Sequence, residues 1–153
     1  MSSPEMPAAD AAPEHVVAAK IADAVRIAWS TGDTAPFAAF AAADYARVAV
    51  DGSRTDLPGW RTMIESAREG FPDLNVEIED TVYQPGAGKL AIRWRGDGSH
   101  LGHYLGVPPT HRRVSWEGAT FFELAEGRVV RERGTWVPDQ LLGALGIYFL
   151  SVD

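Results

Sequence analysis

Hydrophobic residues in the first half of the chain recur at the spacing of amphipathic helices. Segment 14–32 places its valine, isoleucine and alanine side chains on one face and its charged side chains off that face, which predicts a helix. A shorter helix is predicted over 34–43, a strand over 45–50 and a third helix over 56–70, which Pro72 helps to end. The first half of the chain is therefore expected to be mainly helical.

After Pro72 the pattern changes to an alternation of hydrophobic and polar residues, which is typical of half-exposed strands. Strands are predicted over 74–79, 89–95, 114–123 and 128–136. Residues 85–88 (Pro-Gly-Ala-Gly) form a hairpin turn, and Gly96-Asp97-Gly98 is expected to break or bulge the second strand. A closing helix is predicted over 140–145, capped by Asp139.

Helices followed by a run of antiparallel strands predict an α+β fold, with a curved sheet and helices packed on one face. Such a cup has a natural pocket between the concave face of the sheet and the long first helix. No repeat or second core is evident, so one domain is expected over 14–153. Residues 1–13, rich in Ala, Pro and Ser, are predicted to form a flexible tail.

Composition narrows the function. The chain of 153 residues has no cysteine, which excludes disulfides, thiol catalysis and iron–sulfur clusters. Its 14 Lys+Arg against 21 Asp+Glu, a net charge of -7, argue against a nucleic-acid partner. No apolar run of about 18 residues occurs, so no membrane span is expected. The first residues lack the pattern of a secretory signal, and a cytoplasmic location is expected.

A metal site is not expected from the histidines. His100 and His103 are three residues apart on an extended segment, so their side chains should point to opposite faces and not chelate one ion. General acid–base chemistry by side chains is then the default for an enzyme of this composition.

The last strand carries the main candidate for that chemistry. Val130, Glu132, Gly134 and Trp136 share one side, and the apolar members mark this side as inward. Burial of Glu132 would raise the pKa of its carboxyl group towards the range that suits acid–base catalysis. The alternative is that Glu132 lies at the rim, or pairs with an arginine in a structural ion pair.

Two further residues are candidates for proton transfer or hydrogen bonding. His100 continues the inward parity of the strand before it if the register holds through Gly98, and histidine titrates near neutrality. The alternative for His100 is a buried neutral histidine satisfied by a backbone carbonyl. Tyr45 could place its phenol at the mouth of the cup, or it could be a core tyrosine whose hydroxyl group contacts solvent.

Trp94, Trp116 and Trp136 fall on the inferred inner face of three different strands. Packing alone would account for one or two large aromatic residues there. Three together predict a flat-walled pocket for a polycyclic or aromatic ligand, with Thr120 also lining it. A small hydrophobic molecule is therefore the expected substrate.

Four short motifs, in order, resemble the running signature of SnoaL-like polyketide cyclases, a family of the nuclear-transport-factor-2-like superfamily of α+β cone folds. They are Phe71-Pro72-Asp73-Leu74, Gly98-Ser99-His100-Leu101-Gly102, Gly106-Val107-Pro108-Pro109-Thr110 and Gly127-Arg128-Val129-Val130. The resemblance implies an enzyme with no metal or organic cofactor that closes a ring on a natural-product intermediate, commonly by aldol addition. The family's histidine carries over to His100. The family's acidic residue falls at Gly134, and Glu132 lies two places earlier on the same face.

These observations lead to the hypothesis of a cofactor-independent cyclase in which Glu132 and His100 form an acid/base pair and Tyr45 donates to a developing oxyanion. One alternative is an enzyme that opens epoxides in the same pocket. Another is a non-catalytic ligand-binding or dimerisation module. A homodimer is expected in either case, because the outer sheet face of such folds often pairs with a second copy.

Overall fold

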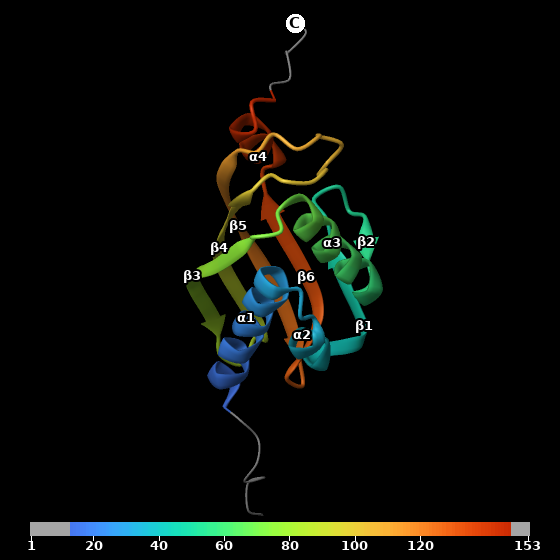
Figure 1. The fold of residues 1–153 in the computed structure, drawn as a ribbon. Coiled ribbons are helices and arrows are strands. Elements are labelled where there is room, and N and C mark those ends of the chain that lie inside the picture. Colours follow the sequence, from blue (N-terminus) through green and yellow to red (C-terminus); the bar gives the residue numbers. More distant parts are fainter. Residues whose placement is uncertain (1–12, 148–153) are drawn as a thin grey trace, which may run out of the picture.

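The computed structural model describes residues 13–147, which form a curved sheet with three helices on one of its faces and a fourth, C-terminal helix at one end of the sheet (Figure 1). Most of the predicted tail, residues 1–12, and the last six residues of the predicted domain, 148–153, lie outside the described residues. The helices are α1 (Glu14–Thr31), α2 (Ala35–Phe40), α3 (Leu57–Gly70) and α4 (Pro138–Ala144). The strands are β1 (Ala41–Val48), β2 (Arg54–Thr55), β3 (Asn75–Gln84), β4 (Lys89–Ser99), β5 (Arg113–Ala125) and β6 (Arg128–Trp136).

The six strands form one sheet in the order β2-β1-β6-β5-β4-β3. Strands β3 to β6 follow one another as antiparallel neighbours, whereas β1 pairs with β6 in parallel, with Arg47 opposite Glu132. The α+β class and the curved sheet predicted from the sequence are confirmed. The parallel pairing of β1 with β6 brings the first and last strands together, and this pairing builds the site described below.

The core lies between the inner face of the sheet and α1, whose Ile21 and Val25 pack against Ile92 and Phe122. α3 contributes Trp60, which is fully buried in the same core. Burial of this apolar surface is the main favourable contribution to folding. Among residues 13–147, no helix combines the length and the apolar character needed to cross a membrane.

Four sequence-based details were wrong. α2 ends at Phe40, and β1 begins at Ala41 and not at 45. β4 runs through Gly96–Gly98 without a break, since its register with β5 is continuous from Lys89 to Ser99. α4 begins at Pro138 with Val137 as its N-cap, so Asp139 lies in the first turn.

The fourth error concerns the first half of β6. A register shift between β5 and β6 leaves Val130 without a partner, so that Val129 is the fully buried residue and not Val130. Val130 is the extra residue of a β-bulge, so the residues before it point inward in the opposite alternation from the residues after it. Glu132, after the bulge, points inward as predicted.

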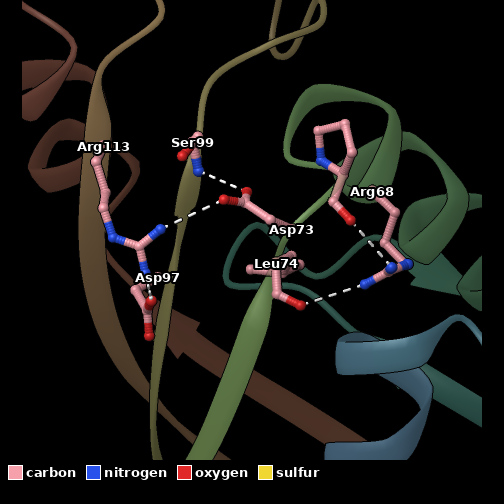
Figure 2. A network of polar contacts seen from close by, with 7 residues as sticks. Arg68, Asp73, Leu74, Asp97, Ser99 and Arg113 are labelled. Atoms are coloured by element: carbon pink, nitrogen blue, oxygen red, sulfur yellow. Dashed lines mark hydrogen bonds and ion pairs between the residues drawn. The ribbon is translucent and has the colours of Figure 1, made fainter.

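A cationic side chain joins three elements at one end of the sheet. The Arg68 guanidinium on α3 donates hydrogen bonds to the carbonyl oxygens of Ser30 at 2.8 Å, Pro72 at 3.2 Å and Leu74 at 3.3 Å. Figure 2 shows the bond to Leu74. The same guanidinium also donates to the carbonyl of Trp29. Arg68 therefore holds the end of α1 and the start of β3 against α3.

We expect Arg68→Met to lower the free energy of unfolding by about 2–3 kcal/mol, because several backbone carbonyls lose a charged donor together. Urea denaturation followed by circular dichroism measures this change. The matched control is Arg26→Met, which removes an exposed ion pair with Asp23 within one helix and should cost less than about 1 kcal/mol. Equal losses in the two variants would contradict the role given to Arg68.

Candidate active site

A cavity of about 410 Å³ lies between the concave face of the sheet, α1 and α3. Its lining is mostly apolar, as is usual for sites that bind small molecules. Four of the chain's five tryptophans contribute to it, together with polar groups from β1, β5, β6 and the segment after β4. The aromatic and polar side chains of its lining include Trp29, Arg47, Trp94, Tyr104, Trp116, Thr120, Glu132 and Trp136.

Glycines opposite the tryptophans make room for these large side chains. In the sheet register Gly118 lies between Trp94 on one side and Trp136 on the other, and Gly96 lies opposite Trp116. A Cβ atom at position 118 would come within 2.6 Å of the Trp94 ring and 2.9 Å of the Trp136 Cβ. The large and small residues are therefore paired across strands, which turns three indoles into a cavity wall.

The predicted substrate-binding residues come together in this cavity. Trp94, Trp116, Trp136 and Thr120 all line it, and the Trp94 indole N–H donates to Oγ1 of Thr120 at 3.1 Å. This hydrogen bond satisfies both polar groups inside an apolar wall and fixes the orientation of the indole. Whether these residues contact a substrate stays a prediction.

Glu132 on β6 is the acidic group of the cavity, and its side chain is 2% exposed. The Tyr45 hydroxyl donates a hydrogen bond to Oε2 of Glu132, and the Arg47 guanidinium donates to Oε1 at 2.8 Å. Both donors come from β1, two residues apart and therefore on one face of the strand. The parallel pairing of β1 with β6 thus holds the carboxyl group from two sides.

Burial raises the pKa of the Glu132 carboxyl group, because the cavity disfavours the charged form. The positive charge of Arg47 and the two hydrogen bonds act in the opposite direction and lower this pKa. Burial also raises the pKa of Tyr45, and the neighbouring carboxylate raises it further. Tyr45 is a buried core residue outside the cavity lining and donates its hydrogen bond to Glu132, so the structure does not place it at the mouth of the cup as the predicted donor to a substrate oxygen.

The structure places His100 outside this cavity lining. Its fully buried ring stacks on Phe71 with centroids 5.2 Å apart, and Nδ1 accepts the backbone N–H of Thr110 at 3.1 Å. Burial lowers the pKa of His100 and favours the neutral ring. Inward parity was predicted correctly, but His100 lies beyond the end of β4, so the structure does not bring it together with Glu132. Its burial agrees with the alternative of a neutral histidine, but the backbone partner is the Thr110 N–H group and not a carbonyl oxygen.

Three of the four motifs behind the family resemblance, at 71–74, 98–102 and 106–110, meet at a junction around His100, whereas the fourth, 127–130, lies at the other end of β5. Asp73 Oδ1 accepts the backbone N–H of Ser99 at 2.7 Å, as Figure 2 shows, and the backbone N–H groups of Leu101 and Gly102 donate to the carbonyl of Gly70. The junction seats the segment that carries Tyr104 and Leu105 at the cavity. The signature around His100 therefore positions a wall of the cavity, and the ionisable groups within the cavity come from β1 and β6.

Three of these cavity residues, Trp29, Arg47 and Tyr104, were not predicted from the sequence. Arg47 lies two residues after Tyr45, so strand parity could have placed it inward, but a charged residue suggests solvent. Trp29 follows Val25 at helical spacing and lies one position beyond the assigned apolar face of α1. Within residues 13–147, no group of three or more His, Asp or Glu side chains is arranged to hold a metal ion.

A curved α+β sheet with an apolar cavity beneath its helices and a buried cluster of Glu132, Tyr45 and Arg47 is the cone-like class of fold that the sequence predicted. A profile of the SnoaL-like polyketide cyclase family matches residues 19–141, and the chain belongs to this family. No curated protein gives a significant match to the sequence.

Solved structures share the fold at low sequence identity. TsrD from Streptomyces laurentii has a TM-score of 0.79 and 20% identity, covering 90% of this chain and 100% of that chain. IdmH from Streptomyces antibioticus, a proposed polyketide cyclase, has a TM-score of 0.73 and 22% identity, covering 85% and 99%. AclR from Streptomyces galilaeus, a candidate hydroxylase, has a TM-score of 0.73 and 22% identity, covering 87% and 95%. At these identities the likeness establishes the fold.

Proposed function

We propose that this chain is a cyclase that closes a ring on a polyketide-like intermediate by acid–base catalysis, without a metal or organic cofactor. The observation that supports it best is the buried Glu132 carboxyl group, held by Tyr45 and Arg47 at the edge of an otherwise apolar, tryptophan-walled cavity. Family membership supports the reaction class.

In the proposed reaction Glu132 removes a proton from the carbon beside a substrate carbonyl, and the electron pair of that C–H bond moves to the carbonyl oxygen. The resulting enolate carbon attacks a second carbonyl of the same molecule and forms the ring C–C bond. Glu132 then returns its proton to the new alkoxide, so that atoms and charge balance. Tyr45 orients the carboxyl group through its hydrogen bond, and the tryptophan walls hold the chain folded for attack.

Product mass tests this proposal. The protein is incubated with aromatic polyketide intermediates that carry an unclosed side chain, and the products are analysed by mass spectrometry and NMR. Aldol ring closure leaves the mass unchanged, whereas hydrolytic opening of an epoxide adds one water. Recovery of an unaltered bound ligand would instead identify a non-catalytic binding module.

Two features of the sequence-based hypothesis stay predictions. A homodimer is expected because the outer sheet face of such folds often pairs with a second copy. Size-exclusion chromatography with light scattering measures the oligomeric state. A cytoplasmic location is expected from the composition. The proposed chemistry requires neither.

A further inference from the structure

Arg47 has a second feature beyond its ion pair with Glu132, because its guanidinium occupies the space above a glycine of β6. A Cβ atom at Gly134 would lie 2.5 Å from Nη2 of Arg47 and 3.1 Å from its Cζ. By resemblance, position 134 is where the family carries its acidic residue. In this chain the Arg47 guanidinium occupies the space beside Gly134, and the carboxyl group lies two residues earlier, at Glu132.

The Arg47 guanidinium has donors to spare. Arginine carries five N–H donors, and within residues 13–147 the side-chain hydrogen bond of Arg47 is the one from Nη1 to Glu132. The side chain is 13% exposed and lines the cavity. The remaining donors of Arg47 are not among the buried side-chain atoms that lack a partner in the part of the chain that the structure describes, so they are open to the cavity and to a molecule bound there.

The charge of Arg47 acts on the cavity and not on Glu132 alone. Tyr104 lines the same cavity from the segment after β4, and burial raises the pKa of its phenol. The positive charge of Arg47 lowers the pKa of the same phenol, so a hydroxyl group inside the cavity already experiences this cation. An acidic oxygen of a bound molecule would experience it in the same way.

We propose that Arg47 is a further catalytic residue, which binds the substrate oxygen on which negative charge develops. This inference rests on the proposed cyclase function. When Glu132 takes the proton from the carbon beside the carbonyl, the charge that develops on the carbonyl oxygen is stabilised by the donors of Arg47 that Glu132 does not use. Donors fixed in place before reaction stabilise such charge without reorganisation.

A binding experiment with 2-naphthol tests this role without turnover, since its acidic hydroxyl on a flat aromatic ring mimics an enol. The long-wavelength absorbance of the naphtholate reports ionisation of the bound probe. We expect wild-type protein to lower the pKa of bound 2-naphthol by roughly one to three units, as a close opposite charge does. Arg47→Met should abolish this shift, and the exposed Arg133→Met on the same sheet should leave it unchanged.

A second variant separates the role of Arg47 from general loss of folding. Gly134→Ala keeps Arg47, Glu132 and Tyr45 but places a methyl group where Nη2 of Arg47 lies. Because the guanidinium is displaced, the ionised fraction of bound 2-naphthol at a fixed pH should fall at least about tenfold. Wild-type protein that does not bind 2-naphthol, or binds it in neutral form, would overturn the proposal. So would naphtholate that persists in folded Arg47→Met.

The cyclase function can fail independently. In Glu132→Gln the cation remains, so ionised 2-naphthol should still bind while ring closure is lost. If the naphtholate shift is present but no substrate is cyclised by wild-type protein, the cyclase proposal fails and Arg47 remains an anion-binding residue.

Discussion

Replacing Glu132 with glutamine is expected to lower kcat for ring closure by about 10²- to 10⁴-fold, the usual contribution of a positioned general base. The amide keeps the shape of the carboxyl group and can still accept a hydrogen bond from Tyr45 and from Arg47, so the cavity should keep its form. Single-turnover kinetics with a cyclised substrate measures the chemical step directly.

Glu123→Gln is the matched control, because Glu123 lies on the neighbouring strand and pairs with Arg131 at the surface. Its kcat should equal that of the wild type. Full activity in Glu132→Gln, with activity lost on Trp116→Ala, would show instead that the cavity acts as a template. Orientation alone can contribute on the order of 7 to 11 kcal/mol to such a reaction.

The pH dependence of kcat/KM provides an independent reading of the same residue. Burial raises the pKa of Glu132, and the carboxylate that acts as base is lost as the pH falls through that raised value. The acid limb of the profile should therefore lie above about 4.3, the ordinary value for glutamate, and should be absent in Glu132→Gln. An acid limb at the ordinary value in the wild type would contradict a buried base.

The fold was predictable from the sequence because its signals are local. Alternation after Pro72 and helical spacing before it depend on the residues of each segment alone, and the structure has the elements they predict. Boundaries failed where one element passes directly into another, as from α2 into β1 at Ala41. The bulge at Val130 could not be foreseen, because it depends on how β6 pairs with β5 and not on its own composition.

The candidate site was predictable only in part, for a related reason. Parity placed Glu132 and the three strand tryptophans inward, and the structure puts all of them in one cavity. Strand parity says which way a side chain points but not how strands align lengthwise. The sheet register places Glu132 level with Leu90 of β4, whereas His100 lies just beyond the other end of β4 and does not reach Glu132. Parity places Arg47 on the same side as Tyr45, but its contact with Glu132 could be predicted only with the knowledge that β1 pairs with β6 in parallel, which joins residues 85 apart in sequence.

His100 allows the sharpest test of how the family signature works in this chain. If its role is to hold the junction, His100→Ala should lower the free energy of unfolding by about 2–4 kcal/mol, since it removes a fully buried ring that packs on Phe71. The corresponding fall in Tm is roughly 5–15 °C. His100→Asn should lose less, because its amide oxygen can accept the Thr110 N–H in place of Nδ1.

Activity and pH distinguish this role from catalysis. Burial lowers the pKa of His100, so the unfolded chain binds a proton more readily than the folded one, and stability should fall as the pH drops below about 6.5. His100→Asn should reduce that slope, which a set of urea titrations between neutral and mildly acidic pH measures. The kcat of folded His100→Asn should stay within about threefold of the wild type, since proton transfer proceeds through Glu132. A loss of 10²- to 10⁴-fold in folded protein would restore His100 as the partner of Glu132 and show that the junction rearranges when substrate binds.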